Sequence, residues 1–144
     1  MTTATDSIIG VLHLSTPTAN IYLDKDAKLL EIEWIGKVDS GDYQKTMMEA
    51  KRLVGEGYGQ AIINRLKLEE INPDSALWLK KEFIKVHLKP VIHNLKKVAT
   101  VESKSAFSRF YSNSLTLAVK VIYPSLSIKS FPSKDDALEW MGII

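Results

Sequence analysis

The stretch over residues 60–88 reads QAIINRLKLEEINPDSALWLKKEFIKVHL, and it decides the fold class. Its first residues, 60–64, form a short apolar run that predicts a buried strand. Asn72 and Pro73 then predict the start of a helix, because proline suits the first helical position. The helix is expected to end near residue 88, because Pro90 breaks or kinks it. A strand followed by such a helix predicts an α/β domain.

The same alternation continues on both sides of this stretch. Before it, the turn signal at residues 24–26 separates two extended runs and predicts a hairpin. The resulting order, β-β-α-β-α-β-α-β-α, predicts an α/β fold: a mostly parallel sheet with an N-terminal antiparallel hairpin, covered by four helices. The expected strands are 20–23, 28–35, 60–64, 97–101 and 126–131, and the expected helices begin at Asp39 or Ser40, Pro73, Ser105 and Ser133.

The length of 144 residues fits one domain. Residues 1–18 are expected to be a loose leader with one short edge strand over Val11–Leu14, and residues 19–144 a single domain. The first seven residues contain no Lys or Arg, so no signal peptide is expected. No run approaches the roughly 20 apolar residues of a membrane-spanning helix.

The composition excludes several classes of function. Lys and Arg together number 19 and Asp and Glu 17, so the net charge of +2 predicts no nucleic-acid partner. The absence of cysteine excludes disulfides, thiolate metal sites and cysteine nucleophiles, and it fits a cytoplasmic location. His13, His87 and His93 lack the spacing of metal ligands, and no serine stands in a nucleophile context. The sequence therefore predicts no metal, no cofactor and no catalytic residue.

Polar residues near the ends of the central strands form a candidate anion pocket. The carboxyl ends of parallel strands are where open α/β sheets bind ligands, and an arginine there can clamp a carboxylate or phosphate. A competing interpretation is that Asn72, Asp74 and Ser75 only cap a helix and that Arg65 pairs with Glu102. An enzyme using this cluster ranks last among the functions considered. The pocket comprises Asn64, Arg65, Asp74, Ser75 and Glu102.

The helix over residues 73–88 carries the leading hypothesis. At 100° per residue, its core stripe is expected to be Ala76, Leu79, Phe83 and Val86, and its outward face Trp78, Lys81, Lys85 and Lys89. A tryptophan among lysines suits an acidic protein partner or an anionic membrane surface. The alternative is a solvated lysine face with the tryptophan packed against its own neighbours.

The apolar arc of this helix is also wider than one sheet contact needs. It extends from Val86 round to Leu88 over about 200°. Because exposed apolar patches often mark interfaces, this width predicts a homodimer.

Four segments in fixed order resemble a known family. They are Trp34-Ile35-Gly36, residues 61–65 (AIINR), residues 97–101 (KVATV) and residues 131–140 (FPSKDDALEW). This order resembles the STAS-like domains of the SpoIIAA-like family, which is related to anti-sigma-factor antagonists. The resemblance implies a small α/β domain that is non-enzymatic and acts by binding a protein, a lipid surface or a small ligand.

One departure from the family concerns phosphorylation. Regulatory members carry an Asp-Ser-Ser-Gly-like motif whose serine is phosphorylated, whereas this chain has Asn72-Pro73-Asp74-Ser75-Ala76, without the serine pair or the glycine. Ser75 is therefore expected to be structural. The sequence as a whole predicts a non-enzymatic binding or regulatory module that presents the 73–88 helix to an unidentified protein partner. Peripheral membrane binding or lipophilic-ligand binding through the same helix is the alternative.

Overall fold

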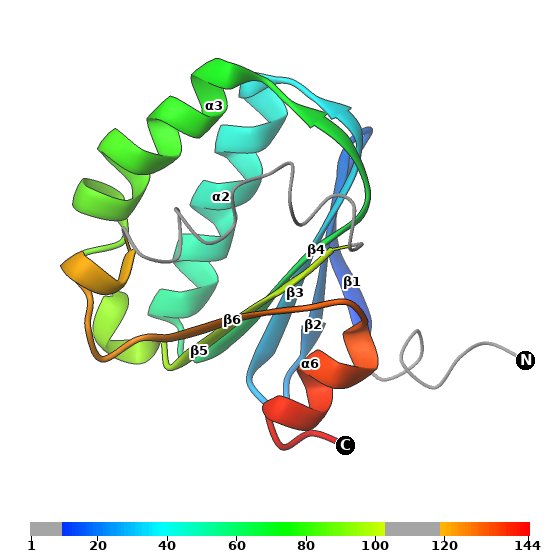
Figure 1. The fold of residues 1–144 in the computed structure, drawn as a ribbon, viewed down its shortest axis with the longest axis vertical. Coiled ribbons are helices and arrows are strands. Elements are labelled where there is room, and N and C mark those ends of the chain that lie inside the picture. The colour runs from blue at the N-terminus through cyan, green and yellow to red at the C-terminus, as the bar shows by residue number, and fades with distance from the viewer. Residues whose placement is uncertain (1–9, 103–118) are drawn as a thin grey trace, which may run out of the picture.

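The computed structural model of the chain describes residues 10–102 and 119–144 (Figure 1). In these residues the strands form one six-stranded sheet in the order β1-β2-β3-β4-β5-β6. The first three strands pair antiparallel and the rest pair parallel. The strands are β1 (Val11–Thr16), β2 (Ala19–Asp24), β3 (Leu29–Val38), β4 (Gln60–Ile71), β5 (Lys97–Val101) and β6 (Ser127–Phe131). The expected mostly parallel sheet with an N-terminal antiparallel hairpin is confirmed.

Two strands extend beyond their predicted bounds. β1 continues through Thr16 and pairs with β2, so the sheet begins within the segment that was expected to be a loose leader. β4 does not end at Asn64 but continues to Ile71 alongside β3, with Val38 paired to Ile71. Four of the last six residues of β4 are exposed, and three of those four are charged. An apolar run marks only the buried half of a strand, which is why this part was missed.

Helical segments occupy the expected positions in the described residues. α2 (Ser40–Gly55) connects β3 to β4, and Asp39 caps it by accepting a hydrogen bond from Asp42 N at 2.8 Å. Residues 119–122 are helical, whereas the start expected at Ser105 lies outside the described residues. The other segments are α3 (Pro73–Trp78), a π-helical continuation η1 (Leu79–His87), a short 3-10 turn η2 (Ile92–Asn94) and α6 (Lys134–Trp140).

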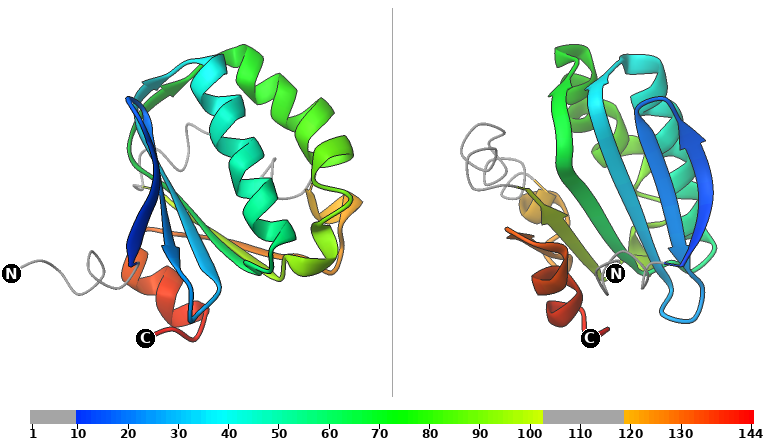
Figure 2. Two further views of the ribbon diagram at one scale, coloured as in Figure 1. Left: turned by 180° about the vertical axis from the view of Figure 1, so that it is seen from behind. Right: turned by 90° about the vertical axis from the view of Figure 1, so that its right-hand side faces the viewer.

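The helices cover the two faces of the sheet unequally. α2 and the α3–η1 helix lie side by side on one face, and α6 lies on the other (Figures 1 and 2). The larger core joins the first face to α2 and η1 through residues such as Trp34, Leu53 and Phe83. A smaller core joins the opposite face to α6 through Ile62 and Leu138. Both faces of the central strands are therefore buried, as expected for a parallel sheet.

The π-helical winding of η1 corrects the predicted core stripe. Phe83 is buried as predicted, but Ile84 and Leu88 are buried with it and Val86 is exposed. Ala76, which lies in the preceding α-helical segment, is also exposed, and the winding of η1 does not account for that. Leu88 N donates to Phe83 O, five residues back, at 2.8 Å. A π-helix has more residues per turn than an α-helix, so side chains drift away from the positions given by 100° per residue. The assumption of a uniform α-helix was wrong here.

Candidate functional site

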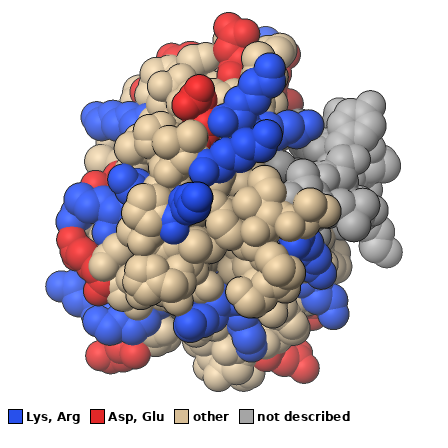
Figure 3. Space-filling view, turned by 90° about the vertical axis from the view of Figure 1, so that its left-hand side faces the viewer, with Lys and Arg blue, Asp and Glu red and all other residues tan. Residues whose placement is uncertain are grey.

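The outward face of α3–η1 combines apolar and basic side chains. Leu77 and Val86 are 52% and 55% exposed, which is unusual for large apolar residues of a covering helix. We call the following set the basic helix face: Leu77, Lys80, Lys81, Lys85, Val86 and Lys89, all of which are exposed. Glu82 is an exposed acidic residue among them. Figure 3 looks onto this side of the molecule and shows a diagonal band of basic side chains beside an uncharged area, with further charged groups toward the edges of the view.

Trp78 does not share the outward face with the lysines. Its ring meets the Tyr43 ring edge-on, with centroids 6.2 Å apart, and packs against Phe83 at 5.5 Å and His87 at 5.9 Å. The side chain is half-buried against the larger core. The expectation that Trp78 is substantially exposed is therefore wrong, and the alternative, packing against its own neighbours, describes the structure. Lys81, by contrast, is exposed as predicted.

Two residues of the expected anion pocket, Asn64 and Arg65, lie on opposite faces of the sheet. Asn64 faces α6, where its Nδ2 donates to Glu31 Oε2 at 2.9 Å. Arg65 faces α2 and η1, and its Nη1 lies 3.5 Å from Glu102 Oε1. Successive residues of a strand point to opposite faces, so Asn64 and Arg65 cannot line one pocket. The structure brings Arg65 and Glu102 together, as the competing interpretation predicted.

Asp74 and Ser75 lie in the first turn of α3. Asn72 caps this helix, because its Oδ1 accepts a hydrogen bond from Asp74 N at 2.8 Å. The Asp74 side chain is exposed, whereas Ser75 is fully buried and its Oγ lies 3.4 Å from Ser40 Oγ. These contacts fit the structural role expected for Ser75.

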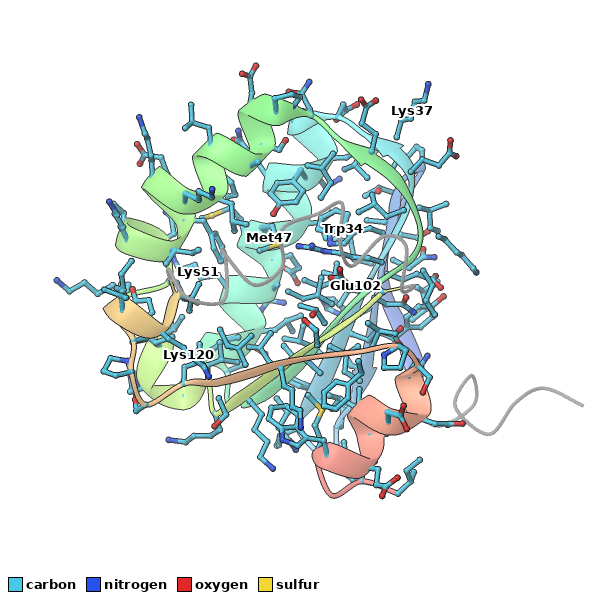
Figure 4. The ribbon with its side chains drawn as sticks, viewed as in Figure 1. Trp34, Lys37, Met47, Lys51, Glu102 and Lys120 are labelled. Carbon is cyan, nitrogen blue, oxygen red and sulfur yellow. The ribbon has the colours of Figure 1, made fainter. Side chains whose placement is uncertain are left out.

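An apolar cavity lies between the sheet and the helices of the larger core. Its volume is about 120 Å³. Figure 4 shows Trp34 from β3, Met47 from α2 and Glu102 in this region between the layers. Among the described residues the cavity wall is mostly apolar and includes Trp34, Tyr43, Met47, Ala50, Phe83 and Leu88, and Lys51, Arg65 and Thr100 add polar groups. Sequence reasoning missed the cavity because no residue pattern reports imperfect packing between helices and a sheet.

In the described part of the cavity wall, Arg65 and the half-buried Lys51 are the basic residues and Tyr43 supplies a phenol, while Glu102 lies behind the wall as the partner of Arg65. The Arg65 side chain is 8% exposed and that of Glu102 is fully buried, so both charges are shielded from solvent. Burial raises the pKa of Tyr43 to about 12, against the opposing effect of the nearby Arg65 charge. Tyr43 therefore stays protonated at neutral pH, and its ring stacks on Trp34 with centroids 4.9 Å apart.

Neither a candidate metal site nor a membrane-spanning helix occurs in the described part of the chain. Over residues 10–102 and 119–144, no three His, Asp or Glu side chains gather in a way that could hold a metal ion. Within the same residues, none of the helices has the length and apolar character needed to cross a membrane.

Two solved structures resemble this chain over nearly its whole length. The first is an uncharacterised protein from the DUF3478 family, with a SpoIIAA-like fold, from Shewanella loihica PV-4. It shares 19% sequence identity, with a TM-score of 0.56 and coverage of 90% of this chain and 99% of that one. The second is the anti-sigma factor antagonist SpoIIAA in its unphosphorylated form. It shares 10% identity, with a TM-score of 0.52 and coverage of 93% and 98%.

The fold is SpoIIAA-like. This finding confirms the fold that the order of sequence segments implied. At these identities the likeness establishes the fold alone. No protein-family model and no curated protein matches the chain.

Proposed function

We propose that this protein is a non-enzymatic, cytoplasmic binding module that presents the basic helix face to a protein partner with an acidic surface. The carrying observation is the exposure of Leu77 and Val86 among lysines on one side of α3–η1. The likeness to an anti-sigma factor antagonist supports a regulatory role for such a module. The division of the polar cluster by the sheet supports the non-enzymatic part of the proposal, because Asn64 and Arg65 cannot act on one substrate.

The chemistry of the face favours an acidic, partly apolar partner. Burying the exposed parts of Leu77 and Val86 would contribute about 1 kcal/mol each, given that full burial of such side chains is worth about 1.5–3 kcal/mol. The lysines would attract acidic groups and speed association, an effect that salt weakens. A helix lying in a membrane interface usually has an aromatic anchor on its apolar side. Trp78 points into the larger core instead, which favours a protein over a membrane.

A homodimer through this face has weaker support than a complex with a different protein. Much of the apolar arc that predicted a homodimer is covered by the chain itself, since Ile84 and Leu88 are buried. Two copies meeting through the basic helix face would also bring like charges together. We therefore treat the homodimer as one outcome of the test.

A charge-reversal experiment tests the proposal. The Lys81→Glu/Lys85→Glu variant is compared with the control Lys25→Glu/Lys37→Glu, which makes the same charge change at exposed lysines elsewhere. Affinity capture from the native cell, followed by identification of bound proteins, should recover an acidic protein with the wild type and the control but not with the first variant. Equal recovery with both variants would count against the basic helix face.

Two added measurements separate the other candidate partners. Co-sedimentation with phosphatidylserine vesicles, lost in Lys81→Glu/Lys85→Glu, would favour an anionic membrane surface. Light scattering that gives twice the chain mass would favour a homodimer.

A further inference from the structure

We propose that the apolar cavity binds a small uncharged molecule with a hydrocarbon body of about five or six carbon atoms and one carbonyl oxygen. The carbonyl oxygen accepts a hydrogen bond from Arg65 Nε, and the body lies among the apolar side chains. This site is on the inner side of η1, whereas the basic helix face is on the outer side. Ligand binding in the cavity is therefore independent of the proposed function, and a negative result for the cavity would leave that function unaffected.

The volume and the apolar wall of the cavity determine the size and the apolar character of the ligand's hydrocarbon body. A dry engineered cavity of about 150 Å³ with apolar walls is known to accommodate benzene. The cavity here is about 120 Å³, so it accepts a body of similar or slightly smaller size. Its wall comes from the sheet through Ile63, from α2 through Ala50 and Met47, and from η1 through Phe83 and Leu88. Water gains little in such surroundings, because it needs two to four polar partners.

Arg65 sets the polar end of the ligand. The side chain lines the cavity and is more than nine-tenths buried. Among the residues that the structure describes, Arg65 Nε has no hydrogen-bond partner. A buried donor left unpaired lowers stability, and a ligand oxygen placed beside it would remove that penalty.

The pairing of Arg65 with Glu102 favours a neutral ligand. Arg65 Nη1 lies 3.5 Å from Glu102 Oε1, and the Glu102 side chain is fully buried. The positive charge is thus already balanced. Lys51, the other basic residue of the wall, is only half-buried. A carboxylate held beside Arg65 would therefore add a second buried negative charge without a buried cation of its own, which is costly. A ketone, aldehyde or ester oxygen accepts the hydrogen bond without that cost.

Methyl NMR on the full chain tests this inference with three probes. They are 2-hexanone, which has the proposed chemistry; hexanoate, which is charged; and benzene, which lacks an acceptor. We expect 2-hexanone to shift the methyl signals of Ile63 and Leu88, which line the cavity. Hexanoate should bind at least tenfold more weakly than 2-hexanone, and benzene more weakly by roughly fivefold, the ratio expected for one net hydrogen bond.

Variants of the protein measure separately how much the hydrocarbon body and the polar end of the ligand contribute to binding. Ala50→Leu fills the cavity and should weaken 2-hexanone and benzene at least tenfold, whereas the control Ala76→Leu adds the same atoms at an exposed site and should change neither. The double variant Arg65→Met/Glu102→Gln removes the donor without leaving a buried charge. It should weaken 2-hexanone roughly fivefold and leave benzene within twofold.

Several results would overturn the inference. Absence of cavity methyl shifts with all three probes in the wild type would show that the cavity is not a site. Tighter binding of hexanoate than of 2-hexanone would show that the ligand is an anion. If benzene equals 2-hexanone in the wild type, Arg65 has no role in binding. Where Ala50→Leu or the double variant does not fold, the ranking of the three probes on the wild type still decides.

Discussion

Lys134 at the start of α6 reaches across to Glu31 in β3, with Nζ 2.9 Å from Oε1. Glu31 is 1% exposed, and its other oxygen, Oε2, accepts the hydrogen bond from Asn64. The carboxylate therefore connects β3, β4 and α6 on the face of the sheet opposite the cavity. Asn64, expected to bind an anion, instead helps to hold a buried carboxylate.

This contact predicts a large loss of stability in Lys134→Met. Removing the ammonium group leaves the Glu31 carboxylate buried without its cation, and breaking a buried pair in this way costs about 3 kcal/mol. The measurement is the free energy of unfolding in urea. The control is Lys120→Met, because Lys120 is exposed and its loss should cost less than about 0.5 kcal/mol. Equal effects of the two substitutions would show that the ion pair does not stabilise the fold.

Trp78→Ala should destabilise the protein although the residue was expected to face outward. The indole packs against Tyr43, Phe83 and His87, and truncation of a fully buried large aromatic costs about 3–5 kcal/mol, so about 2 kcal/mol is expected for this half-buried one. Leu77→Ala, one position earlier but exposed, should cost less than about 0.5 kcal/mol. Thermal unfolding of both variants makes the comparison. A neutral Trp78→Ala would mean that the ring contributes no packing energy.

Ser75→Ala should leave partner binding unchanged and cost about 0.5–1 kcal/mol at most, because its hydroxyl makes one long contact with Ser40 and the cap of the helix is Asn72. Ser75→Asp should destabilise more, since it places a charge at a fully buried position. Unfolding curves and capture of the partner measure the two effects. Stoichiometric phosphoserine at position 75 in protein from its native cell, together with a folded Ser75→Asp variant that loses its partner, would restore a phosphorylation switch.

The carboxyl group of Glu49 on α2 is expected to make a pH-dependent contribution to the stability of the fold. The hydrogen bonds from Arg52, at 2.6 Å and 2.8 Å, lower the pKa of the Glu49 carboxyl from 4.5 to about 2, and His13 adds to the effect. A depressed pKa stabilises the fold above the ordinary value, and that contribution is lost as the pH falls from about 4.5 to about 2.

The Glu49 contribution should be small, because the side chains are partly exposed to solvent. Glu49→Gln should cost less than about 1 kcal/mol at pH 7, and the difference from wild type should shrink as the pH falls below about 4.5 and vanish below about pH 2. Glu70→Gln, at an exposed position, is the control. A difference that persists unchanged at pH 2 would show that charge is not its source.

Much of the fold could be predicted from local signals. Apolar runs and alternation located the central strands, and the side chains of Asp39, Asn72 and Ser133 cap their helices as expected. The winding of η1 could not be predicted, because a helical wheel assumes one period and the stretch from Leu79 to His87 adopts another.

The candidate site was harder to predict than the fold. Strand ends gather at one edge of a sheet, but successive side chains such as Asn64 and Arg65 point to opposite faces. Only the full extent of β4 reveals this, since the strand continues past both residues. The cavity depends on how closely α2 and η1 pack against the sheet, which is a property of tertiary structure and not of any one segment.

The most direct test of the proposed function is photo-cross-linking from position 86 in the native cell. A photoreactive phenylalanine analogue replaces Val86 in the basic helix face, and a control places the same group at exposed Lys25. We expect a covalent adduct with one acidic protein from position 86, absent from position 25 and lost when Lys81→Glu/Lys85→Glu is added. The same adducts from both positions, or an adduct that survives the charge reversal, would rule out the basic helix face as the binding surface.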